Sequence, residues 1–201
     1  GSEKSSSRSL LIQIVVRKKK WGNLMIKGER VLLRPITKED LSIQHKYYQN
    51  IEHFTLNASL PQVTSIESMD EWYELATKRD EDNQFLAIEV EGKYIGYCSI
   101  KNSKTWPGNF WYGISIGDPE YREKGLGSEV TKLMIDHTFH YLGARRIGLG
   151  TNSKNPRAIR CFASCGFVEE GRIRKHYWIS GSYADYVYMG ILREEWENSK
   201  K

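Results

Sequence analysis

The chain has 201 residues, of which 39% are hydrophobic, and its mean hydropathy is −0.58. This length supports one domain with a substantial core, and the composition is typical of a soluble globular protein. The formal net charge is +5, and part of it lies in one basic run at residues 17–20. A charge this small, without a basic helix or a base-reading motif, argues against a nucleic-acid-binding protein.

The sequence also shows no pattern typical of a transmembrane helix or a signal peptide. Residues 10–16 form an apolar run far shorter than a transmembrane helix. Basic residues follow this run rather than precede it, which is the wrong order for a signal peptide. We therefore expect a cytoplasmic protein with no membrane partner.

The cysteines and histidines predict neither a metal site nor a disulfide framework. The chain has 3 cysteines, Cys98, Cys161 and Cys165, and no Cys-x-x-Cys motif. His137 and His140 lie three residues apart in a predicted helix, with no third ligand evident in the sequence nearby. We expect reduced thiols and no metal.

The first 24 residues differ in composition from the rest of the chain. Gly1-Ser2 resembles a cleavage scar, and a serine-rich, then apolar, then basic stretch follows it. Met25 looks like a natural start. We expect residues 1–24 to be a tag or a disordered extension, although residues 10–16 could pair as an extra strand, and residues 25–201 to form a single domain.

Within residues 25–201, strand-like and helix-like patterns follow one another without a repeat or a linker, which predicts one mixed α/β domain. We expect helices from Thr37 to about Tyr48, from Ser65 or Ser68 through Ala76, after Gly125 up to Gly143, and over residues 158–163. Residues 49–65 and 101–109 are expected to be loops. Strands are expected at residues 30–35, 84–90, 94–100, 110–116, 145–151, 167–179 and 183–192.

A glycine turn between a predicted strand and a predicted helix carries the strongest functional signal. Residues 121–128 read Tyr-Arg-Glu-Lys-Gly-Leu-Gly-Ser, and apolar residues then recur at three- and four-residue spacing. This layout points free backbone N–H groups at an anion, and glycine lets a phosphate approach closely. The spacing matches neither a P-loop nor a dinucleotide fingerprint. Alone, it is equally compatible with a helix start that needs only a tight turn.

Two motifs in this order resemble the signatures of the GNAT family of N-acetyltransferases. Residues 122–127 resemble that family's acetyl-CoA pyrophosphate loop, Arg/Gln-x-x-Gly-x-Gly/Ala. Residues 155–167, which begin Asn-Pro-Arg-Ala and end Gly-Phe, resemble its second signature. Residues 30–40 and 169–185 resemble the branch that includes ribosomal-protein N-terminal and spermidine acetyltransferases. The resemblance covers residues 25–195.

The resemblance implies an α/β (α+β) GNAT fold. Its central sheet would be mixed, mostly antiparallel, with six to seven strands, a V-shaped splay and about four flanking helices. It also implies that acetyl-CoA is the co-substrate, with pyrophosphate bound at the glycine loop and pantetheine bound along the preceding strand and by Asn155. Asn155 also fits an ordinary helix cap, and both roles are compatible. The implied cofactor-binding residues are Ile114, Ser115, Ile116, Arg122, Glu123, Lys124, Gly125, Leu126, Gly127, Ser128, Asn155, Ala158 and Phe162.

The catalytic residues are less well determined. Many relatives carry a tyrosine acid seven residues after the signature asparagine, whereas this chain has Phe162, which has no proton to donate. Cys161 is a weak candidate for that acid and fits better as a small buried residue. For the base, the candidates are Tyr112, acting through a water, and Glu52 and His53 in the loop expected to line the acceptor side.

The expected reaction is direct transfer of acetyl to a primary amine in a ternary complex. The acceptor could be a polyamine, an amino sugar, an aminoglycoside or a protein N-terminus, and the protein a monomer or a homodimer. Phe162 leaves a catalytically weak acyl-CoA-binding module as the alternative. Carboxylates for a cationic acceptor could come from the predicted second helix, although an acidic helix face is usually just solvated; they are Glu67, Asp70, Glu71 and Glu74.

Overall fold

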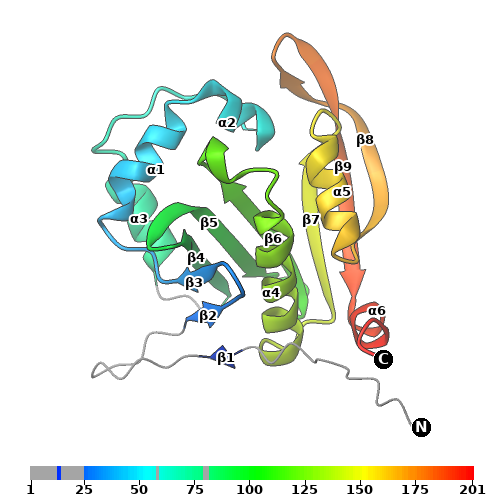
Figure 1. Cartoon of the computed structure of the whole chain (residues 1–201). Coiled ribbons are helices and arrows are strands. Elements are labelled where there is room, and N and C mark those ends of the chain that lie inside the picture. The colour runs from blue at the N-terminus through cyan, green and yellow to red at the C-terminus, as the bar shows by residue number, and fades with distance from the viewer. Residues whose placement is uncertain (1–12, 15–24, 58, 79–81) are drawn as a thin grey trace, which may run out of the picture.

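A computed structural model describes residues 13–14, 25–57, 59–78 and 82–201. One mixed sheet runs through the molecule in the strand order β1-β2-β3-β4-β5-β6-β7-β9-β8 (Figure 1). The strands are β1 (Gln13–Ile14), β2 (Ile26–Lys27), β3 (Leu32–Arg34), β4 (Asn83–Val90), β5 (Lys93–Asn102), β6 (Asn109–Ile116), β7 (Arg146–Asn152), β8 (Val168–Ile179) and β9 (Ser182–Leu192).

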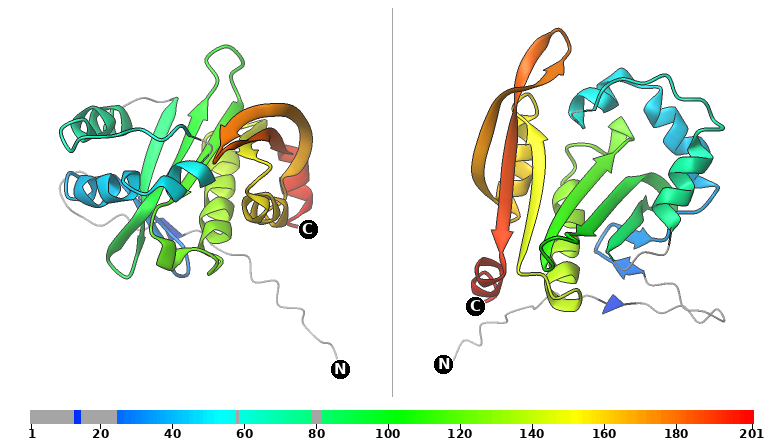
Figure 2. Two further views of the ribbon diagram at one scale, coloured as in Figure 1. Left: turned by 90° about the horizontal axis from the view of Figure 1, so that it is seen from above. Right: turned by 180° about the vertical axis from the view of Figure 1, so that it is seen from behind.

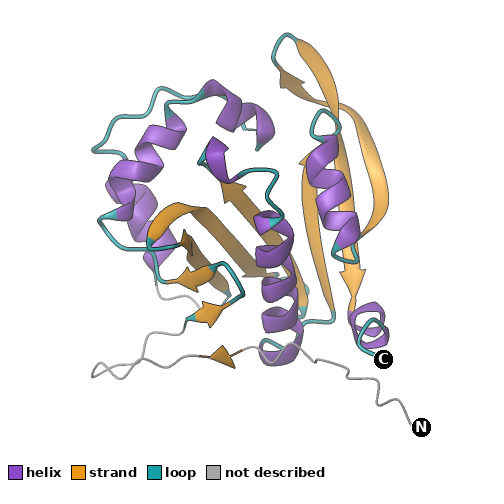
Figure 3. Ribbon diagram, in the orientation of Figure 1, coloured by secondary structure: helices purple, strands orange, loops and turns teal. Residues whose placement is uncertain are grey.

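Six α-helices and one 3-10 turn accompany these strands in the described residues (Figure 3). Helix α4, which follows the glycine turn, is the longest and connects β6 to β7. The elements are α1 (Asp40–Tyr48), α2 (Ile51–Leu56), α3 (Met69–Thr77), η1 (Pro119–Tyr121), α4 (Leu126–Tyr141), α5 (Pro156–Ser164) and α6 (Arg193–Asn198).

The centre of the sheet divides between β6 and β7. These strands are parallel, and their pairing covers only Asn109 with Arg146, Phe110 with Ile147 and Trp111 with Gly148. Beyond Trp111 the two strands diverge, while β6 stays paired with β5 as far as Ile116 and β7 stays paired with β9 (Figure 2). The result is a V-shaped opening between two continuous half-sheets.

Each face of the first half-sheet has its own apolar core. On one face, the α4 side chains Val130, Leu133 and Met134 pack in a large cluster with strand residues such as Ile88 and Ile147. On the other face, α1 and α3 cover a smaller cluster built from Ile36, Ala76, Ala87 and Tyr94. Alternating side chains of β4 therefore point to opposite cores, as Ala87 and Ile88 do.

The expected fold class is confirmed, with more elements than expected. The sheet has nine strands when the two-residue β1 is counted, against the expected six to seven. The described part of the chain has six α-helices rather than about four. One addition, β1, lies in residues 10–16, which the sequence allowed as an extra strand. The others are β2, α2 and α6, which are too short for apolar periodicity to register.

One loop prediction was wrong in part. Residues 49–65 contain α2, which begins after Asn50, whose side-chain oxygen accepts the Glu52 N–H at 2.9 Å. His53 and Phe54 are buried and hold the helix against the molecule. Six residues suffice because this cap and these two side chains replace the stability that length would supply.

The expectation for residues 1–24 falls almost entirely outside the described residues. Within that stretch the structure describes only Gln13–Ile14, which pairs antiparallel with β2. Among the described residues, no helix is both long enough and apolar enough to cross a lipid bilayer.

Candidate active site

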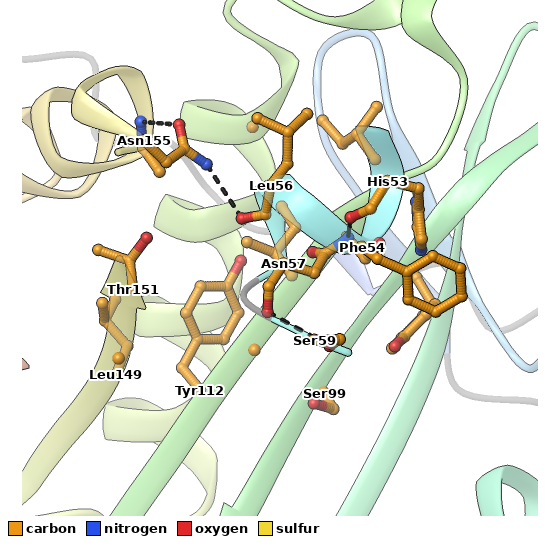
Figure 4. Close-up of a pocket in the computed structure, with 18 of the residues that line it drawn as sticks. His53, Phe54, Leu56, Asn57, Ser59, Ser99, Tyr112, Leu149, Thr151 and Asn155 are labelled. Carbon is orange, nitrogen blue, oxygen red and sulfur yellow. Dashed lines mark hydrogen bonds between the residues drawn. The ribbon is translucent and has the colours of Figure 1, made fainter. Parts of the chain in front are cut away.

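A cleft of about 1150 Å³ opens where β6 and β7 diverge. Its walls come from both half-sheets, from α2 and α3 on one side and from the glycine loop and α5 on the other. Figure 4 shows Tyr112 between Thr151 and Asn155 on one side and Phe54 on the other. The cleft therefore joins two regions, one beside the glycine loop and α5 and one beside α2 and α3.

The glycine loop presents an open helix N-terminus to this cleft. Glu123 and Gly125 both adopt left-handed backbone conformations, with φ of 61° and 76°. Gly125 is the N-cap of α4 and has no side chain to accept from the first turn. The first α-helical bond runs from Glu129 N–H to Gly125 O at 3.1 Å, so the N–H groups of Leu126, Gly127 and Ser128 precede it. A Cβ on Gly127 would meet nothing closer than 3.7 Å.

Arg122 supports this loop in a way that the sequence did not indicate. Its side chain donates to the backbone oxygens of Ile116 and Gly117, at 3.2 and 3.1 Å, and forms an ion pair with Glu52 at 3.1 Å. Its guanidinium is therefore committed to the end of β6, which it ties to the loop. Glu129 anchors the other side of the loop by accepting from Arg30 N–H at 2.7 Å.

Two further cations line the cleft beside the loop. Arg157 and Arg160, both on α5, belong to the lining, and Arg157 pairs with Glu123 at 2.6 Å. Lys124 is exposed, with its ammonium 5.5 Å from the centre of the Tyr121 ring. Neither arginine was among the residues predicted from the sequence to bind the cofactor. Their position inside the second signature, on the helix that faces the phosphate loop, was the available signal.

The strand before the loop has backbone and side-chain groups available in the cleft. Ile114, Ser115 and Ile116 pair with β5 on one edge and have left β7 on the other. The Ser115 hydroxyl oxygen is buried and has no hydrogen-bond partner within the described residues. A buried polar group without a partner is costly, so this position favours a ligand that supplies one.

Asn155 begins α5 and connects it to α2. Its Oδ1 accepts from Ala158 N–H at 3.1 Å, and its Nδ2 donates to Leu56 O at 3.2 Å (Figure 4). Asn152 also donates to the end of α2, to the backbone oxygen of Thr55 at 3.3 Å. The helix-cap interpretation is thus correct, and the same side chain lines the cleft. These bonds tie α2 to the opposite wall.

A phenol lies beside Phe162, the position at which the GNAT resemblance implies a tyrosine. The Tyr112 and Phe162 rings meet edge to face with centroids 6.5 Å apart. Tyr112 is 3% exposed, and its hydroxyl lies 3.1 Å from Thr131 Oγ1, which donates its own proton to Gly127 O at 2.7 Å. Tyr112 is therefore the donor in that pair. Burial raises the pKa of Tyr112 well above its ordinary value.

The other two base candidates lie differently. His53 lines the cleft, is 3% exposed, and its Nδ1 has no partner within the described residues. Burial, with a smaller contribution from the charge of Arg122, lowers the pKa of His53 to about 4. Glu52 is absent from the lining of the cleft in the described residues, and its carboxylate pairs with Arg122.

Residues 30–168 match the family described as the acetyltransferase (GNAT) domain, so the chain belongs to the GNAT family of N-acetyltransferases. Over 176 residues it is 29% identical to the SPbeta prophage-derived uncharacterized N-acetyltransferase YokL of Bacillus subtilis, covering 85% of this chain and 94% of that protein. Over 174 residues it is 28% identical to the spermidine N(1)-acetyltransferase of Vibrio cholerae, covering 85% of this chain and 98% of that protein.

The fold is also similar to a crystal structure of spermidine N-acetyltransferase from Vibrio cholerae in complex with CoA and spermine. The TM-score is 0.76 at 25% sequence identity, and the match covers 85% of this chain and 100% of that chain. The chain is an acetyl-CoA-dependent N-acetyltransferase.

Proposed function

We propose that the chain transfers acetyl from acetyl-CoA to a primary amine of a small molecule or a protein N-terminus by direct attack in a ternary complex. The observation that carries this proposal is that the gap between β6 and β7 and the glycine loop both face one cleft. An extended ligand arm fits beside the diverged strand, and its anionic end fits the loop. A similar protein supports the proposal, because the spermidine N-acetyltransferase of Vibrio cholerae binds CoA and spermine in its crystal structure.

The cofactor half of the cleft divides the work among several groups. The N–H groups of Gly125 to Ser128 hold the pyrophosphate, and Arg157 and Arg160 add positive charge beside it. Backbone groups of Ile114 to Ile116, with the Ser115 hydroxyl, accept the amide-bearing arm. Arg122 acts through the loop that it fastens to β6.

Tyr112 is the group that we assign to protonate the leaving thiolate. As the neutral amine attacks the thioester carbonyl, a C–N bond forms, the C–S bond breaks, and the sulfur takes the phenolic proton. The raised pKa keeps Tyr112 protonated before the reaction, which suits an acid and not a base. Thr131 can then turn its hydroxyl proton from Gly127 O to the phenolate, because its Oγ1 lies 3.1 Å from the Tyr112 oxygen.

His53 is the remaining candidate to take the proton that the amine loses. Its imidazole is neutral at physiological pH because its pKa is about 4. A base this weak holds a proton only briefly, so it acts as a relay to water rather than as a store. Glu52 fits a supporting role through Arg122.

Steady-state kinetics test the reaction. With acetyl-CoA and a panel of amines, CoA release is expected, with initial-rate plots that intersect as a ternary complex requires. Tight CoA binding in a thermal-shift assay without release from any amine or peptide would instead support the catalytically weak acyl-CoA-binding module.

A pair of exchanges tests Tyr112. We expect Tyr112→Phe to lower kcat by at least about a hundredfold, the lower end of the range for general acids, with little change in acetyl-CoA affinity. Phe162→Tyr restores a phenol next to the lost one and should recover part of that kcat in the double variant. Unchanged kcat in Tyr112→Phe contradicts the assignment, and thermal unfolding checks that each variant is folded.

A further inference from the structure

The part of the cleft beside α2 and α3 is walled by aromatic rings. We call it the acceptor chamber and define it by Tyr48, Phe54, Trp72, Phe85 and Tyr97, which all line the cleft. They come from α1, α2, α3, β4 and β5 in turn. Figure 4 shows Phe54 and Ser99 on the side of Tyr112 away from Asn155.

These rings form one connected wall. Trp72 meets Tyr97 edge to face with centroids 5.4 Å apart, and Phe85 lies 6.2 Å from Tyr97. Tyr48 and Phe54 stack at 5.9 Å, and a hydrogen bond between the Tyr48 and Tyr97 side chains joins the two groups. Because four of these five rings are only half-buried, apolar surface remains open to a ligand.

Negative charge in the chamber is sparse. Among the described residues that line the whole cleft, the carboxylates are Glu71 and Glu123, and Glu123 pairs with Arg157 in the cofactor half. Among the described residues, Glu71 is thus the acidic group that lines the chamber. The lining does not include the other acidic residues of the α3 region, which are Glu67, Asp70 and Glu74.

The polar groups of the wall add no charge. Burial raises the pKa of Tyr48 and of Tyr97, so both phenols stay neutral. His53 is neutral as well, and the guanidinium of Arg122 lies close enough to lower its pKa. Spermidine would keep two ammonium groups after one amine became neutral to attack, and spermine would keep three, whereas one carboxylate can neutralise only one of them.

We propose that the acceptor is a primary amine carried on an apolar body about the size of one aromatic ring, the arylalkylamine class, rather than a polyamine. This inference rests on the proposed acetyl transfer and specifies its acceptor. The ring of the acceptor packs against Trp72 and Tyr97, and its amine extends toward the thioester beside β6. Glu71, which is exposed, attracts the protonated amine from solution.

A comparison of amines as acetyl acceptors tests the proposed substrate class. Each of phenethylamine, tryptamine, spermidine, spermine and glucosamine is assayed for CoA release at one pH and one acetyl-CoA concentration. We expect kcat/KM for the two aryl amines to exceed that for the other three by at least about tenfold. Preference for spermidine or spermine overturns the inference while leaving acetyl transfer intact.

Variants locate the effect in the chamber. Trp72→Ala should raise KM for phenethylamine by about tenfold or more, whereas Trp72→Phe, which keeps a ring, should stay within about threefold of the wild type. Trp106→Ala is the matched control, because Trp106 is 67% exposed and lies in the β5–β6 connection. Glu71→Gln should affect phenethylamine less than Trp72→Ala does, and the reverse order contradicts the inference.

Acetyl-CoA binding separates the two possible failures. A thermal shift with acetyl-CoA reports that each variant is folded and that the cofactor half is intact. If acetyl-CoA binds and no amine in the panel releases CoA, the acetyl-transfer proposal itself fails and the acceptor assignment falls with it.

Discussion

Acidification should destabilise this protein through one buried histidine. The pKa of His53 falls from 6.5 to about 4 on folding because the imidazole is buried near Arg122. Between these two pH values the unfolded chain binds a proton that the folded chain does not, so stability rises with pH in this window. A difference of about 2.5 pH units at about 1.36 kcal/mol per unit gives a loss of about 3 kcal/mol from pH 6.5 to pH 4.

Urea unfolding at a series of pH values measures this loss. Other groups also titrate in the window, so the quantity of interest is the difference between the wild type and His53→Phe. The phenylalanine packs against Tyr48 and Phe54 as the imidazole does and carries no titrating group. We expect the variant to lose about 3 kcal/mol less than the wild type between pH 6.5 and pH 4.

A matched control comes from an exposed histidine. His140→Phe makes the same exchange on the exposed surface of α4 and controls for the substitution itself. Parallel curves for the wild type and His53→Phe would refute the reasoning, because they would mean that burial of His53 does not disfavour its proton.

Three further predictions concern the cofactor half. Gly125→Ala places a side chain at φ of 76°, so the free energy of unfolding in urea should fall by about 1–2 kcal/mol and acetyl-CoA should bind more weakly. An unchanged affinity for acetyl-CoA would contradict the role of this loop in binding the cofactor. Asn155→Ala removes the α5 cap and the bond to Leu56 O, and should lower the free energy of unfolding by about 1–2 kcal/mol. Asn155→Asp keeps the acceptor for Ala158 N–H and should lower it less, so equal losses in the two variants would contradict the cap. Cys161 lines the cleft, and hydrogen bonds from Cys165 and Ser128 lower the pKa of its thiol, so iodoacetamide should label it. Bound CoA should slow this labelling, measured by peptide mass spectrometry, and equal rates with and without CoA would mean that the bound cofactor does not cover Cys161.

Local sequence patterns predicted much of this fold because the signals were local. The helix after Gly125 follows from apolar spacing and a glycine turn, and β4, β5 and β6 follow from runs bounded by turn residues. Helix α2 was missed because its stability depends on a cap at Asn50 and on burial of Phe54, which only the tertiary structure reveals. Its missed position also hid the wall of the acceptor chamber.

The candidate site shows the same division. The glycine loop could be placed from sequence because its function resides in consecutive backbone groups. The role of Arg122 could not be placed, since its partners at Ile116, Gly117 and Glu52 depend on where the chain returns. The proximity of Tyr112 to Phe162 joins residues fifty positions apart and has no local signature.

The opening between β6 and β7 has a consequence for solubility as well as for binding. Two strand edges in the middle of a sheet expose unpaired backbone groups, and such edges can recruit a strand from another chain and start aggregation. Here Asn152 and Asn155 fasten the end of α2 across the gap, which narrows the opening to a slot between the two strand edges. A slot of this kind favours a single slender arm over a whole β-strand with its own neighbours. The bonds that hold α2 in place thus act as a guard against misassembly, and their loss should make the protein more prone to aggregate.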